Sequence, residues 1–410
     1  MSRLQTVYNE DELPAFTPME WKLTEIRAAI PARLFVRDTR QGLYYLIRDI
    51  LLAAAVSSLA HRIDPLFRNL HTIQNFNPFL IELLRWSAWC IYWWFQGLIF
   101  TGIWVIGHEC GHGAFSDHKF INDFIGFATH TFLWTPYFSW KISHHRHHSN
   151  HASMERDEVY IPQTRADLRL PKDNDPGLDY SEILGDTPIY TLYILIRRQL
   201  LAFPAYLLFN VSGQNTYPKW TNHFNPRSIL FTPSQRNAVM LSNAGILFMI
   251  WAVRRASWIF GLGTVIKYYG IPWLLVTHWF IMITYLHHTD PVIPHYRGAE
   301  WNFQRGAAAT VDRPILGWQG RFFLHDVAHF HVVHHFFPKM PFYHTPEATK
   351  YLKAFLRDHY VRDDTPAFKA LWRNYNLCQF VENEGDVLFY RNRQGQAVRR
   401  PVTKREAKNK

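Results

Sequence analysis

The segment that most limits how this chain can fold lies at residues 86–107 (WSAWCIYWWFQGLIFTGIWVIG), which carry no charged side chain. Its length meets the roughly 20 apolar residues that an α-helix needs to cross a bilayer. The 16 Trp and 20 Tyr residues crowd the apolar segments of the chain, as they do in the aromatic belts at membrane interfaces. The sequence therefore predicts an integral membrane protein that is mostly α-helical.

Further apolar segments accompany this one. Residues 44–60 are apolar but contain Arg48 and Asp49, so they cross a bilayer only with the charged end at the interface. Together, residues 44–107 are expected to form one hairpin and residues 238–286 a second, which gives about four transmembrane helices. Between the arms of the second hairpin lie Arg254, Arg255 and Lys267, on the side where the positive-inside rule disfavours them.

The remaining segments are expected to lie at or outside the membrane. The segment at 120–140 is interpreted as re-entrant or interface-lying, or alternatively as a buried helix of a cytosolic domain. A cytosolic N-terminal segment (1–43, with a helix at 17–30 capped by Thr17), an interfacial helix (189–211) and a basic C-terminal tail (391–410) complete the predicted organisation. The predicted membrane domain spans residues 44–390.

The net charge and the cysteines indicate which cellular environment and which partners the protein has. The net charge of +11 fits a cytoplasmic face that meets anionic lipid and acidic partners. No basic helix, finger or stacking motif indicates a nucleic-acid partner. The three cysteines, Cys90, Cys110 and Cys378, argue against a disulfide framework and for a reducing face. The first 40 residues lack the apolar core of a cleavable signal peptide.

A first histidine box, HECGH at 108–112, directly follows the longest apolar segment. His108 and His112 stand at i and i+4, so they share one helical face. The pentad also satisfies H-E-x-x-H, the helix of zinc proteases with Glu109 as general base. A zinc protease needs a third ligand and leaves the other histidine clusters unexplained.

Two further boxes have the same spacing. His144, His147 and His148, and later His331, His334 and His335, each stand at i, i+3 and i+4. Neutral imidazole is the commonest metal ligand among side chains. The alternative for 144–148 is a soluble, basic surface run that happens to be rich in histidine.

If each hairpin crosses the membrane twice, all three boxes are expected to lie on one face of the membrane. The boxes supply eight histidines, and His288, in the pair at the end of the last apolar segment, makes nine. Nine imidazoles exceed what one tetrahedral zinc needs, and they suit two ions with four or five nitrogen ligands each. Ligand type favours iron and oxygen chemistry on an apolar substrate. A metal transporter would instead place ligands along the spans.

Five more histidines are interpreted as structural or as supporting the ligands rather than as ligands. They are His118, His130, His151, His278 and His325.

The residues in and around these boxes resemble the membrane fatty acid desaturases, in the oleate delta-12/omega-3 branch known from plants and fungi. The similarity includes HECGH, AFSD, PYFSWKISHHRHHSNHASMERDEVYIP, ITYLHHTDP, RGAAATVDR and MPFYHTPEAT, and it covers most of residues 17–390. Two departures occur: His145 stands where many members have Arg, and HDVAHFH precedes the third box in place of the commoner run.

The resemblance implies an endoplasmic-reticulum enzyme, multi-pass, with its histidine boxes and di-iron domain facing the cytosol. It implies that O2 and two electrons from cytochrome b5, supplied with its reductase, introduce a cis double bond into an acyl chain. No HPGG haem-binding stretch occurs, so the donor is expected to be a separate protein. The implied ligands of the two Fe ions are His108, His112, His144, His147, His148, His288, His331, His334 and His335.

Within the resemblance, Glu109 favours delta-12 desaturation of an oleoyl chain to linoleate, since plant omega-3 members often carry Asp there. An omega-3 (delta-15) or bifunctional delta-12/delta-15 desaturase, an acyl hydroxylase and an epoxygenase share the same boxes. Glu109, Asp157 and Asp312 are the candidate carboxylates that orient the imidazoles. The acyl carrier and the oligomeric state stay open.

Overall fold

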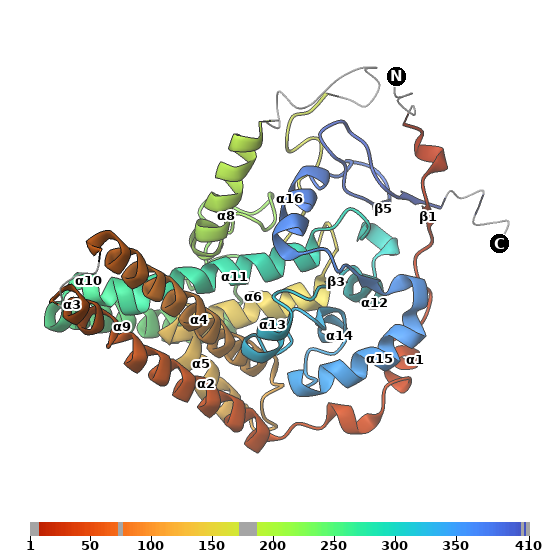
Figure 1. Cartoon of the computed structure of the whole chain (residues 1–410). Helices are drawn as coiled ribbons and strands as arrows, with labels where there is room; N and C mark the ends of the chain where they lie inside the picture. The colour runs from red at the N-terminus through yellow and green to blue at the C-terminus, as the bar shows by residue number, and fades with distance from the viewer. Residues whose placement is uncertain (1–7, 73–76, 172–186, 403–405, 407–410) are drawn as a thin grey trace, which may run out of the picture.

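The computed structural model describes residues 8–72, 77–171, 187–402 and 406, and its long elements are helices (Figure 1). Five helical stretches are long and apolar enough to cross a membrane: Thr39–Leu70, Pro78–His112, Pro188–Phe209, Pro233–Phe260 and Leu262–His288. The protein is therefore a mostly helical, multi-pass membrane protein.

The first hairpin consists of α2 (Thr39–Ala60), α3 (Ile63–Thr72) and α4 (Pro78–His112). α4 is the central helix, because 72% of its 18-residue apolar stretch is buried inside the protein. For the corresponding stretch of Thr39–Leu70, which includes α2, the buried share is 17%. Asn77 caps α4 by accepting from the amide of Phe79 at 2.9 Å, and Gly113 ends it with a left-handed φ of 72°. The first box thus lies inside the last turn of α4, later than the predicted end at residue 107.

The second hairpin runs through α9 (Arg236–Phe260), α10 (Leu262–Val265), a π-helical turn η4 (Ile266–Gly270) and α11 (Ile271–His288). The turn of this hairpin contains Lys267, one of the three basic residues that the sequence predicts on the side of the membrane where positive charge is disfavoured. Lys267 lies 2.9 Å from the carboxylate of Asp64 in α3, which also accepts from Arg85 at 3.0 Å. The charge is therefore neutralised by the neighbouring hairpin.

Two helices occupy the segment around 120–140, for which the sequence left alternatives open. α5 (Lys119–Phe132) packs along α4, with the rings of Phe132 and Phe100 centred 5.4 Å apart. α6 (Tyr137–Asn150) then packs on α4 through Trp140, whose ring lies 5.1 Å from that of Trp104. Both helices are thus held against the central helix.

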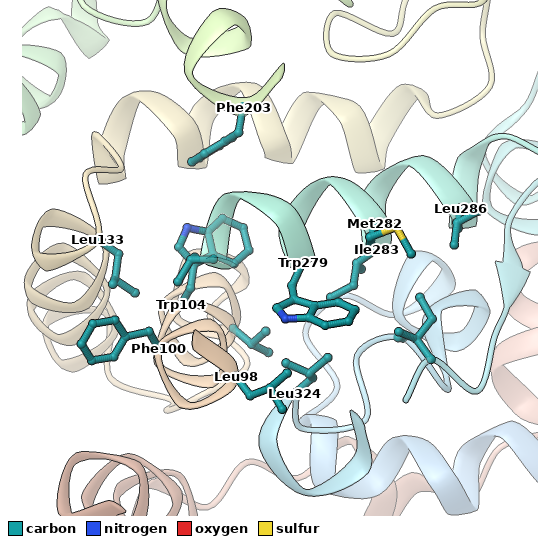
Figure 2. Packing of buried hydrophobic residues seen from close by; sticks show 14 of the residues in the cluster. Leu98, Phe100, Trp104, Leu133, Phe203, Trp279, Met282, Ile283, Leu286 and Leu324 are labelled. Atoms are coloured by element: carbon teal, nitrogen blue, oxygen red, sulfur yellow. The ribbon is translucent and has the colours of Figure 1, made fainter. Parts of the chain in front are cut away.

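The largest apolar core lies where α4, α11 and α8 (Pro188–Phe209) meet. Figure 2 shows Trp279 of α11 over Leu98 of α4, with Phe203 reaching in from α8. Trp279 and Leu98 are fully buried. α8 was expected to be interfacial, and by length and composition it also meets the criterion for a span.

The C-terminal third of the chain packs at the ends of α4, α6 and α11 that carry the histidines (Figure 1). Its elements are β2 (His295–Tyr296), η5 (Gly298–Glu300), α12 (Phe303–Ala308), β3 (Val311–Asp312), α13 (Trp318–Phe323), α14 (His331–Phe336), η6 (Phe342–His344), α15 (Thr345–Leu356), η7 (Arg357–His359), β4 (Val361–Arg362), α16 (Ala367–Leu377), β5 (Val387–Leu388) and β6 (Arg400–Pro401). A 3-10 turn, η3 (Pro233–Gln235), precedes α9.

The N-terminal segment packs on this C-terminal part. It contains η1 (Glu10–Glu12), β1 (Ala15–Phe16), α1 (Leu23–Ala28) and η2 (Ala32–Phe35). β1 pairs in parallel with β6, β2 antiparallel with β5, and β3 in parallel with β4.

One expectation about the N-terminal end of the chain differs from the structure. α1 is shorter than the predicted helix at 17–30, because it begins after Lys22, whose backbone amide donates to the side chain of Glu25 at 2.7 Å, and its N-cap is therefore not Thr17. Of the predicted basic tail at 391–410, the structure describes residues 391–402 and 406, where β6 pairs with β1 and Arg391 lies 2.9 Å from Glu10. Residues 403–405 and 407–410 of that tail lie outside the described residues.

Candidate metal centre

The first two boxes meet because α4 and α6 pack side by side. His108 and His112 of α4 have their Nε2 atoms 3.3 Å apart, and His144 and His148 of α6 have theirs 3.2 Å apart. The rings of His112 and His148 are centred 4.4 Å apart. The i, i+4 spacing within each helix thus aims four imidazoles at one point between the two helices.

The third box divides between two groups. His334 of α14 joins the four histidines of α4 and α6. His288, at the end of α11, lies between the other box residues, with its Nε2 3.4 Å from the Nε2 atoms of both His147 and His331. His335 lies close to His288 and His331. The nine predicted residues therefore fall into a group of five and a group of four.

These distances fit bound metal ions. Two nitrogens on one ion are roughly 3.0–3.4 Å apart when each bond is about 2.1 Å long and the angle is 90–109°. Within the described part of the chain, Nε2 of His334 and both ring nitrogens of His335 are buried without a hydrogen-bond partner. Such orphaned buried atoms need an explanation, and a metal ion at each group supplies one.

Burial also sets the protonation state that metal binding needs. It lowers the pKa of His144, His148, His331 and His335 well below the ordinary value, and it lowers the pKa of His334 to about 3. These imidazoles are therefore neutral near pH 7, which is the form that ligates metals.

Two of the three candidate carboxylates touch these imidazoles. Glu109 accepts from Nδ1–H of His108 at 3.0 Å, and Asp157 accepts from Nδ1–H of His147 at 2.9 Å. Burial alone would raise the pKa of Asp157, but His147 and His151 lower it to about 2. Each carboxylate fixes the tautomer that presents Nε2 to the interior of its group.

The third candidate, Asp312, has a different contact. It accepts from the backbone amide of Val332 at 2.7 Å and from the hydroxyl of Tyr360. Burial raises its pKa to about 7. Asp312 therefore holds the first turn of α14, and with it the third box, instead of an imidazole ring.

Histidines other than the nine predicted ligands lie in several places. His118 and His145 lie at the surface, while His278 stacks on Phe368 at 6.1 Å. His130 donates to the carbonyl of Trp104 at 3.0 Å, and His325 contacts Asp49 at 2.7 Å. His287 faces the carbonyls of Ile283 and Ala328. One ring nitrogen of His130, one of His325 and both of His287 thus have a partner without a metal.

His151 is the residue whose position the sequence did not anticipate. Its ring lies 4.4 Å from that of His288 and 4.8 Å from that of His335, and it stands with His147 and His335 in a possible metal-holding group. It donates through Nε2 to the carbonyl of Ala309 at 2.9 Å. Its i+4 spacing from His147 was the available signal.

Apolar helices long enough to cross a bilayer, together with two groups of imidazoles arranged as metal ligands are, define the class of protein: a membrane protein with candidate metal sites. A model of the fatty acid desaturase family matches residues 84–367. Delta(12) fatty acid desaturases of Mortierella alpina and Mortierella isabellina are each 41% identical over 386 residues, covering 93% of this chain and 92% of the relative. The chain belongs to the fatty acid desaturase family.

The relatives also carry a second activity in their names. The oleate hydroxylase of Claviceps purpurea is 40% identical and covers 92% of this chain and 82% of its own length. The oleoyl-12-hydroxylase of Ricinus communis is 40% identical and covers 93% and 92%, respectively. Family membership makes this protein an oxidoreductase, and it leaves the zinc-protease interpretation of HECGH without support.

Proposed function

We propose that this protein introduces a cis double bond at the delta-12 position of an oleoyl chain to give linoleate. The observation that carries the proposal is the meeting of nine histidines from four separate segments in two buried groups. The delta-12 position rests on the relatives named for it at 41% identity over most of both chains.

Two Fe ions are the proposed cofactors. His108, His112, His144, His148 and His334 would hold one, and His147, His288, His331 and His335 the other. Bound there, iron supplies the activation of O2 that an unactivated methylene C–H bond requires. The donor set is all imidazole, which suits Fe as well as Zn or Cu, and the family assignment favours Fe.

The chain's own residues position these groups and keep water away. Glu109 and Asp157 orient His108 and His147. Trp104 and Trp140 each precede a proposed ligand by four residues, and together they form an apolar surface beside the histidines. The ring centres of Trp140 and His144 are 4.3 Å apart, and the two rings are stacked.

Topology and partners complete the proposal. Four spans in two hairpins place both histidine-bearing ends, those of α4 and α11, at the cytosolic face of the endoplasmic reticulum membrane. α8 lies at the interface because Arg197 and Arg198 stand in its middle. Cytochrome b5, a separate and acidic electron donor, suits the net charge of +11.

The deciding experiment is expression in a host that makes oleate but no linoleate, followed by fatty acid profiling. Appearance of linoleate supports delta-12 desaturation. A hydroxylated oleate would favour the second candidate, an acyl hydroxylase, which the 40% identical hydroxylases support. Production of linolenate from supplied linoleate would move the activity to omega-3, and an unchanged profile despite good expression would refute all three.

A further inference from the structure

A groove of about 350 Å³ lies between α2, α4 and α5, apart from the histidine groups. Its lining includes Ile50 and Ala53 of α2, Ile103 of α4, and Phe124, Ala128 and Thr129 of α5. Ile50 and Phe124 are 51% and 63% exposed, so the groove opens sideways between α2 and α5. The proposed function assigns nothing to it.

The lining is chemically uniform. Thr129 is the one polar residue in it, and its hydroxyl already donates within α5 to the carbonyl of Ile125 at 2.9 Å. The groove therefore presents hydrocarbon alone and offers water no partner. An apolar cavity of this kind stays dry, whereas a hydrocarbon ligand gains the full benefit of leaving water or filling empty space.

The position of the groove between membrane helices makes lipid acyl chains the hydrocarbon that lies next to it. α2 and α4 are both helices that qualify as membrane spans, and the groove lies midway along α2, beside Ile50 and Ala53. Its extent along α2 is roughly 10 Å, from 1.5 Å per residue.

A closed contact separates the groove from the metal centre. Thr129 and His130 pack against Gly107 so closely that a Cβ on Gly107 would lie 2.6 Å from Oγ1 of Thr129 and 2.3 Å from the ring of His130. His130 in turn donates to the carbonyl of Trp104 at 3.0 Å. A chain in the groove therefore does not reach His108, although it touches the helices that seat this residue.

We propose that the groove binds one acyl chain of a membrane phospholipid. The bound chain fills the contact between α2, α4 and α5 and so stabilises the last turns of α4. It is distinct from the chain that is oxidised. The inference rests on the membrane position of α2 and α4 and not on delta-12 activity.

The test uses the full-length protein in nanodiscs of phosphatidylcholine that carries a diazirine on one acyl chain. After irradiation, labelled peptides are identified by mass spectrometry. Ala128→Trp fills the groove from α5 and Ala53→Trp fills it from α2, while Ala55→Trp adds the same side chain at an exposed position of α2 outside the lining.

We expect labels on the α4 and α5 peptides that line the groove, and a decrease of about tenfold in both filled variants but none in the control. Added phosphatidylcholine should raise the melting temperature of the wild type in detergent and leave that of the filled variants unchanged. Equal labelling of wild type and both filled variants would overturn the proposal. So would loss of the label on adding excess oleoyl substrate, since the groove would then belong to the substrate path. Both readouts are independent of whether linoleate forms.

Discussion

Replacing Asp157 by Asn tests how the second group of histidines is held. Asp157 is fully buried, accepts from Nδ1–H of His147 at 2.9 Å and accepts from the amide of Val159 at 3.0 Å. Asn keeps the size and can still accept from Val159, but its amide NH2 then faces His147. Donation from this NH2 requires an unprotonated Nδ1, so the ring proton moves to Nε2, the nitrogen that faces His288.

The expected loss follows from that change of tautomer. Loss of an orienting partner of a metal-bound histidine typically costs 10–100-fold in metal affinity, which is about 1.4–2.7 kcal/mol. We expect Asp157→Asn to bind one of two Fe ions at this lower affinity. The assay is iron content of purified protein after equilibration with increasing concentrations of chelator.

The matched control is Glu155→Gln, since Glu155 is an exposed carboxylate of the same loop whose contact is Arg297 at 3.4 Å. It should retain iron as the wild type does. If Asp157→Asn kept both ions at wild-type chelator concentrations, the orienting role of Asp157 would be refuted.

Three further changes have defined outcomes. His147→Ala should abolish desaturation while the protein stays in the membrane fraction, and retained activity would remove the second box from the site. Gly107→Ala should lower the melting temperature, because its Cβ would lie 2.3 Å from the ring of His130, an overpacking that costs roughly 1–3 kcal/mol; an unchanged value would contradict the tight α4–α5 contact. The metal-free protein should lose stability as pH falls from 6.5 towards 3, because the pKa of His334 is lowered from 6.5 to about 3 by burial and only the unfolded state takes up its proton in that window. This histidine changes the free energy of unfolding by roughly 1.4 kcal/mol per pH unit in that window. The check is urea unfolding of wild type and His334→Gln at pH 5 and pH 7. An equal change in the free energy of unfolding of both proteins between these pH values would show the reasoning to be wrong.

Local sequence carried much of the candidate site. Spacing of three and four residues placed His144 and His148 on one face of α6, and the uncharged segment before His108 identified α4, because both patterns depend only on helix geometry and apolar length. The sequence also selected Glu109 and Asp157 as carboxylate partners, and the structure shows each against an imidazole.

Other features depend on partners far away in the chain. The structure separates His288, which joins a histidine group, from its neighbour His287, which faces the carbonyls of Ile283 and Ala328. It brings Asp64 to Lys267 across 203 residues. A buried polar group needs a partner, but the partner's identity depends on which helices pack together, and no local pattern encodes that choice.

The sequence by itself therefore determined the membrane helices, the three boxes and their family. Only the tertiary structure decided how nine imidazoles divide into groups of five and four, that His151 stands beside the second group, and that Asp312 holds the start of α14. The physical reason is that periodicity depends on neighbours a few residues apart. The direction of an imidazole lone pair and the partner of a buried charge instead depend on contacts between helices distant in the chain.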